Sequence, residues 1–185
     1  MGKQTRGESG AGDFEELILP HLDAAYNLAR WLVRDGHDAE DIVQEAYLRA
    51  FKFFGSYQGG DPRAWVLKIV RNTSYSFLEK NRPAELAEQF DETLHTTDTR
   101  QPDAETALLQ SVESRTLREA LEELPVNFRE VLVLRELEGL SYKEIAAVME
   151  LPIGTVMSGL ARGRAQLRER LMRARYQEEQ RGPRR

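Results

Sequence analysis

The stretch SYKEIAAVMELPIGTVMSGLARGRAQLRERL, residues 141–171, decides the fold of the second half of the chain. Ser141 is followed three residues later by Glu144, which is a capping box and predicts the start of a helix. A Pro-x-Gly turn at residues 152–154 ends that short helix, and Thr155 caps a second one. Apolar residues recur at helical spacing in both helices and predict the side of each helix that is buried. They are Ile145, Ala146, Met149, Val156, Leu160, Leu167 and Leu171.

The second of these helices is strongly basic. Residues 155–175 hold six arginines against one glutamate, a net charge of +5. Two short helices around a tight turn, the second one basic, are typical of a helix-turn-helix. The alternative is an ordinary helical hairpin inside a core. Such a hairpin does not need this positive charge, whereas binding to a phosphate backbone does.

Charge is unevenly distributed along the 185 residues, so the formal net charge of −5 is a poor guide to partners. Two basic segments, residues 61–82 at +3 and residues 155–175 at +5, flank residues 83–124 at −8. This pattern indicates two DNA-facing surfaces held apart by an acidic linker. The absence of cysteine excludes disulfides and thiolate metal sites, and we expect no metal, no cofactor, no signal peptide and no membrane insertion.

Helical periodicity continues through the rest of the chain, and no segment alternates with period two. Pro20 predicts a break in the first helix, while Asp38 and Asp61 are predicted to cap the next two. The predicted fold is therefore all-α, with two small helical bundles joined by an acidic linker and a helix-turn-helix in the second bundle. The predicted divisions are a disordered arm at 1–12, a first domain at 13–82, a flexible linker at 83–102, a second domain at 103–175 and a tail at 176–185.

Three stretches resemble the extracytoplasmic-function group of bacterial sigma factors, within the sigma-70 family. DAEDIVQEAYLRAFKFF (residues 38–54) is similar to the group's second conserved region, and AWVLKIVRNTSYSFLEKNRP (64–83) to its promoter −10 helix. LPVNFREVLVLRELEGLSYKEIAAVMELPIGTVMSGLARGRAQLRERL (124–171) is similar to the domain that reads the −35 element. The three stretches follow one another in the family's order.

The resemblance implies a dissociable polymerase subunit that melts and reads the −10 element and reads the −35 element, without catalysis of its own. It implies three sets of site residues. The polymerase-docking set is Asp41, Gln44 and Glu45. The −10 set is Ser56, Tyr57, Asp61, Lys68, Arg71, Asn72, Tyr75 and Lys80. The −35 set is Ser141, Thr155, Met157, Ser158, Arg162 and Arg164.

The partners that the resemblance implies are core RNA polymerase (the beta-prime clamp helices and the beta flap), promoter DNA and an anti-sigma factor. We expect a cytoplasmic chain that is monomeric when free. The family typically has basic residues at the places of Met157 and Gly159, so the −35 contact should depend on Thr155, Ser158, Arg162 and Arg164. Two other functions are alternatives: a dimeric operator-binding regulator, and an enzyme of nucleotide or phosphate chemistry. A regulator of this kind does not need the stretches at residues 38–54 and 64–83. The sequence offers such an enzyme neither a phosphate loop nor a nucleophile–base pair.

Overall fold

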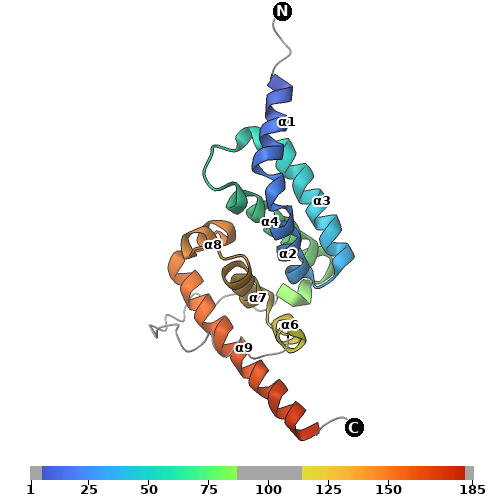
Figure 1. Ribbon diagram of the computed structural model, residues 1–185, viewed down its shortest axis with the longest axis vertical. Coiled ribbons are helices and arrows are strands. Elements are labelled where there is room, and N and C mark those ends of the chain that lie inside the picture. Colours follow the sequence, from blue (N-terminus) through green and yellow to red (C-terminus); the bar gives the residue numbers. More distant parts are fainter. Residues whose placement is uncertain (1–5, 87–113, 182–185) are drawn as a thin grey trace, which may run out of the picture.

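The computed structural model describes residues 6–86 and 114–181, and within these ranges every regular element is a helix (Figure 1). This confirms the all-α prediction. The N-terminal bundle consists of α1 (Arg6–Leu17), η1 (Leu19–His21), α2 (Leu22–Val33), α3 (Gly36–Phe53), η2 (Phe54–Ser56), α4 (Pro62–Asn81) and η3 (Pro83–Leu86). The C-terminal bundle consists of α6 (Ser114–Glu122), α7 (Val126–Leu132), the π-turn η4 (Val133–Leu137), α8 (Tyr142–Met149) and α9 (Ile153–Arg181).

Helix boundaries in the N-terminal bundle follow local signals. Pro20 lies in the short η1 turn that separates α1 from α2, as predicted. Asp35, rather than the predicted Asp38, caps α3, because its carboxylate accepts the backbone N–H groups of both His37 and Asp38. Asp61 caps α4 by accepting the backbone N–H of Arg63 at 3.0 Å, as the sequence predicts.

The helix-turn-helix is formed by α8 and α9, and its first cap is the predicted one. The Ser141 hydroxyl accepts the backbone N–H of Glu144 at 3.3 Å, and the Glu144 carboxylate accepts that of Ser141 at 2.6 Å. The second helix begins at Ile153, two residues before the predicted cap Thr155. Glu150 adopts a left-handed conformation (φ 56°) that ends α8 at once, so the turn is shorter than the Pro-x-Gly pattern suggested.

Both described ends of the chain are more helical than predicted. Residues 6–12 belong to α1 instead of a disordered arm, since extending an existing helix costs much less than nucleating a new one. For the same reason α9 continues through the predicted tail as far as Arg181. Most of the predicted linker and the start of the second domain, residues 87–113, lie outside the described residues.

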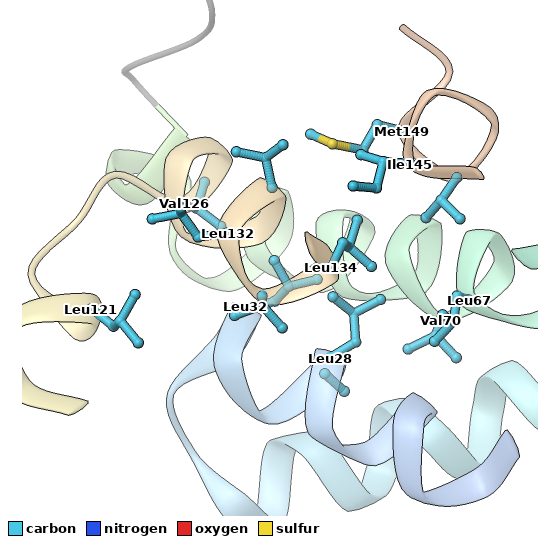
Figure 2. Packing of buried hydrophobic residues seen from close by; sticks show 14 of the residues in the cluster. Leu28, Leu32, Leu67, Val70, Leu121, Val126, Leu132, Leu134, Ile145 and Met149 are labelled. Carbon is cyan, nitrogen blue, oxygen red and sulfur yellow. The ribbon is translucent and has the colours of Figure 1, made fainter. Parts of the chain in front are cut away.

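The two bundles pack directly against each other, in contrast to the expectation of two modules held apart. A single cluster of buried apolar side chains runs from α2 and α4 into α7, η4 and α8 (Figure 2). Leu28 and Leu32 of α2 and Leu67 of α4 face Leu134 of η4 and Ile145 of α8 in this cluster. Helix α7 lies in the middle and is buried on all sides, as expected for a helix covered by neighbours on every face.

Within the two described ranges, no single helix has the length and hydropathy needed to cross a membrane. Helix α8 and residues 153–177 of α9 reach that threshold only when they are taken together, across a bend of 101°.

Candidate nucleic-acid and polymerase interfaces

The predicted polymerase-docking residues lie together on the exposed side of α3. Asp41, Gln44 and Glu45 are all exposed, while Ile42 and Ala46 between them are buried. Glu45 forms an ion pair with Arg49 one turn along the helix. This side of α3 therefore presents carboxylates and an amide to solvent, as the sequence predicts.

The same face of α3 also carries apolar side chains that the sequence analysis did not single out. Leu48 is 66% exposed and Phe51 is 56% exposed, and both follow Gln44 at helical spacing. The ring of Phe51 packs edge-on against Phe14 of α1, with centroids 5.3 Å apart. The face is thus amphipathic, which is typical of a protein–protein contact surface.

The loop between α3 and α4 is held by its own hydrogen bonds and by aromatic packing. The Ser56 hydroxyl donates to the carbonyl of Phe53 at 2.6 Å, and the Tyr57 hydroxyl donates to that of Gly60 at 2.8 Å. Tyr57 is half-buried because its ring stacks on Phe54 and tilts against Trp65, with centroid distances of 5.9 and 5.3 Å. Ser56 and Asp61 remain exposed at the two ends of the loop.

The predicted −10 residues of α4 divide into an exposed group and a covered group. Asn72 and Lys80 are exposed. Arg71 and Tyr75, which belong to the −10 set that the resemblance implies, meet a carboxylate of the C-terminal bundle. Arg71 Nε donates to Glu130 Oε1 at 2.6 Å, and the Tyr75 hydroxyl donates to Glu130 Oε2 at 2.7 Å.

The Arg71–Tyr75–Glu130 group is almost fully removed from water. The Glu130 side chain is 0% exposed and that of Arg71 is 17% exposed, and the guanidinium also lies 4.4 Å from the centre of the Tyr75 ring. Burial raises the pKa of Glu130, an effect that Arg71 and the Tyr75 hydroxyl partly offset. Burial next to Glu130 raises the pKa of Tyr75 well above its usual value, so the phenol stays protonated and can donate.

Two further contacts join α4 to the C-terminal bundle. Lys68 Nζ lies 2.8 Å from Glu150 Oε1, at the end of α8. Arg63 forms an ion pair with Glu138, just after η4, and the same carboxylate accepts a hydrogen bond from Asn27 of α2. The basic face of α4 is therefore directed at acidic residues of the C-terminal bundle.

The predicted −35 residues lie at the start of the helix-turn-helix and along α9. Ser141 and Met157 are exposed, the latter by 47%, while Thr155, Ser158 and Arg162 are half-buried. The Ser158 hydroxyl donates to the carbonyl of Thr155 at 3.0 Å. Arg164 forms an ion pair with Glu136 at 2.6 Å within the same bundle.

Two of the three glycines of α9, Gly159 and Gly163, face the protein interior, while Gly154 is exposed. Because Gly159 is buried, a side chain at this position would not lie on the exposed side of the helix. A Cβ on Gly163 would lie 3.3 Å from Leu132 and 3.4 Å from the carbonyl oxygen of Phe128. Gly163 thus permits the close approach of α9 to α7.

The sequence analysis missed the acidic residues that meet α4, which are Glu130, Glu138 and Glu150. A signal existed for Glu130, since NFREVLVL places an adjacent cation and anion inside an apolar run, and buried charges need partners. Which partner it finds depends on long-range packing, and no local pattern encodes that.

Comparison with known proteins agrees with this architecture. Residues 17–83 match the family model described as Sigma-70 region 2, and residues 114–167 match that described as Sigma-70, region 4. The first range lies in the N-terminal bundle and leaves out most of α1, and the second lies in the C-terminal bundle and ends within α9.

Among curated relatives, the chain is 35% identical over 170 residues to the ECF RNA polymerase sigma factor SigE of Mycolicibacterium smegmatis. That match covers 90% of this chain and 65% of the relative, so the chain spans somewhat less than two thirds of that relative's length. It is 34% identical over 168 residues to the RNA polymerase sigma-H factor of Pseudomonas aeruginosa, covering 86% of this chain and 85% of the relative.

Among solved structures, the fold resembles the sigma factor RpoE of Bartonella quintana, determined in complex with the anti-sigma factor NepR. The TM-score is 0.66 at 28% identity, over 86% of this chain and 97% of that one. The two family regions, the relatives and the all-helical fold lead to one conclusion: the chain belongs to the extracytoplasmic-function group of sigma-70 RNA polymerase sigma factors, which direct promoter-specific initiation and are not enzymes.

Proposed function

We propose that the exposed face of α3 docks on the beta-prime clamp helices of core RNA polymerase. The observation that carries this assignment is the amphipathic character of the face, with Asp41, Gln44 and Glu45 beside the exposed Leu48 and Phe51. Carboxylates and an amide give charge-assisted contacts that fix orientation, while apolar side chains contribute affinity. The C-terminal bundle would bind the beta flap.

Helix α4 and the loop before it would hold the −10 element. Lys68, Arg71 and Lys80 attract phosphate, while Asn72 and Tyr75 offer hydrogen bonds and a stacking surface to unpaired bases. The loop residues Ser56, Tyr57 and Asp61 would border the pocket for a base extruded from the stack, since trapping that base offsets a cost of a few kcal/mol.

The helix-turn-helix would read the −35 element with α9 in the major groove. Thr155, Ser158, Arg162 and Arg164 are the residues that can donate to phosphates or base edges. Ser141 at the start of α8 and the exposed Met157 complete the proposed surface, the latter through apolar contact only.

A mobility-shift experiment with promoter duplex tests this function. The chain should shift promoter DNA tightly only when core polymerase is present, whereas a dimeric operator-binding regulator would do so alone. Glu45→Lys should weaken capture of the chain by core polymerase about tenfold, equivalent to about 1.4 kcal/mol. Asp23→Lys, the same charge reversal at an exposed site on α2, should leave capture unchanged. Equal effects of the two reversals would refute the docking assignment.

An anti-sigma factor is the regulatory partner that we infer for this chain in the cytoplasm, where it would otherwise be a monomer. The solved relative in complex with NepR supports a partner of this class. Co-purification of a second small protein that suppresses transcription, and whose removal restores it, would identify the partner.

A further inference from the structure

The first turns of α9 carry a row of apolar side chains on their outward side. Ile153 and Met157 are each 47% exposed, although both are large apolar residues, and Ala161 is exposed as well. The three residues follow one another at intervals of four, so they lie on the same side of the helix, and we call them the apolar stripe. The buried side of α9 is formed by other residues, Val156 and Leu160, so the stripe is not part of the core.

The hydrogen-bonding side chains of this segment lie beside the apolar stripe. Each residue turns a helix by about 100°, which places Arg162 about 100° to one side of Ala161 and Arg164 about 60° to the other. Both arginines are half-buried, and Arg164 is held in an ion pair within the bundle. The Ser158 hydroxyl donates to the carbonyl of Thr155 in the same helix. The stripe itself therefore presents methyl and methylene groups and no side-chain hydrogen-bond donor.

The major groove of DNA offers one apolar group that matches such a surface, the C5-methyl group of thymine. In a helix-turn-helix, the first residues of the second helix are the ones that reach base edges in that groove. From Ile153 to Ala161 the helix rises about 12 Å, which corresponds to roughly three or four base-pair steps. Arginines on both sides of the stripe suit the phosphates that border the groove, since phosphate contacts position a protein and base contacts specify the sequence.

We propose that α9 reads the −35 element through thymine methyl groups, with Ile153 and Met157 as the specificity-determining side chains. This inference rests on the proposed function of the helix-turn-helix and adds the chemical group that it recognises. The −35 element should contain A·T pairs at the positions that face the apolar stripe. A G·C pair there would bring polar base edges against side chains that cannot hydrogen-bond with them, which disfavours it.

Replacement of thymine by deoxyuridine tests the proposal, because it removes the C5-methyl group and keeps the base pairing. The promoter is one from which core polymerase with this chain initiates on a genomic fragment library. Each thymine of its −35 element, on either strand, is replaced singly, and the affinity of the polymerase complex for the promoter duplex is measured by mobility shift. We expect at least one replacement to weaken binding about fourfold, as for one methyl group that is no longer removed from water.

Variants of the chain assign this loss to the apolar stripe, because deoxyuridine can also change the flexibility of the duplex. In Met157→Ala or in Ile153→Ala, the same replacement should weaken binding by less than about twofold, since the contact with the methyl group is already lost. Met157→Leu keeps an apolar side chain of similar size and should retain most of the effect. Coupling of this kind between one base and one side chain identifies a direct contact.

Met172→Ala is the matched control. Met172 is another exposed methionine of α9, at 55%, but it lies about four helical turns beyond Met157. Its replacement should change neither the affinity for the promoter nor the effect of deoxyuridine. Thymines in the spacer between the −10 and −35 elements provide the corresponding control in the DNA.

Three results would overturn the methyl readout. They are a −35 element without thymine on either strand, no loss of binding from any replacement, and a loss that is equally large in wild type and in both alanine variants. If the chain still directs initiation from the unmodified promoter, only this inference fails and the proposed function stands. If core polymerase with the wild-type chain initiates at no promoter, the proposed function fails and the inference falls with it.

Discussion

Arg129 supports a sharp prediction because one buried guanidinium caps two helices in different bundles. The residue is 1% exposed. Its Nη1 donates to the carbonyl of Glu122, the last residue of α6, at 2.9 Å and to that of Leu124, two residues beyond the helix, at 3.1 Å. Its Nη2 donates to the carbonyl of Leu32 at the end of α2, at 3.1 Å. Carbonyls at helix C-termini lack partners within the helix, and a cation is favourable there.

Replacing Arg129 with methionine keeps much of the volume and leaves three carbonyls without this donor. At a net value of about 1 kcal/mol for each hydrogen bond, the variant should lose about 3 kcal/mol of unfolding free energy. With an m-value of about 2 kcal/mol/M, the midpoint of urea unfolding should fall by about 1.5 M.

The matched control is Arg170→Met. Arg170 donates to the carbonyl of Glu123 at the longer distance of 3.3 Å, and its ion pair with the same residue spans 3.8 Å. We expect a loss of about 0.5 kcal/mol there, as for other exposed ion pairs. Equal midpoint shifts for the two arginines would show that Arg129 does not join the bundles as described.

Three further predictions concern the helix-turn-helix. Ser141→Ala should reduce the unfolding free energy by about 1 kcal/mol at pH 7, measured by urea unfolding, because the cap of α8 is lost. The hydrogen bonds from Ser141 lower the pKa of Glu144 below its usual 4.5. This stabilisation should therefore be present above pH 4.5 and disappear as the pH falls through the lowered pKa. If the unfolding free energies of wild type and Ser141→Ala differ by a constant amount down to about pH 3, this prediction is contradicted. Gly163→Val should lower the melting temperature, because even a Cβ would lie 3.3 Å from a leucine of α7, and an unchanged value would show that the helices can separate at no cost. Arg162→Glu should weaken binding of the polymerase complex to promoter duplex far more than Met157→Ala, and equally small effects would remove Arg162 from the −35 surface.

Most of the fold could be predicted because its signals are local. The capping box of Ser141 and Glu144, the cap at Asp61 and the break at Pro20 each depend on neighbours within a few residues, and the structure has all of them. The observed start of a helix differs from the predicted one where two residues could each cap it. Asp35 and Asp38 are such a pair, since either aspartate precedes the apolar side of α3.

The relation between the bundles could not be predicted, because it depends on contacts between residues far apart in the sequence. Arg71 and Tyr75 have the spacing of an exposed polar face, and only the position of Glu130 makes that face an interior one. The outward face of α3, with Gln44 and Glu45, was predictable because its neighbours lie on the same helix.

The central claim is that this chain directs polymerase to defined start sites. Mapping the 5′ ends of transcripts made by core polymerase on a genomic fragment library, with and without the purified chain, tests it most directly. The account predicts new 5′ ends that appear only with the chain and lie at a constant distance downstream of two shared sequence elements. An identical set of 5′ ends in both reactions would contradict it.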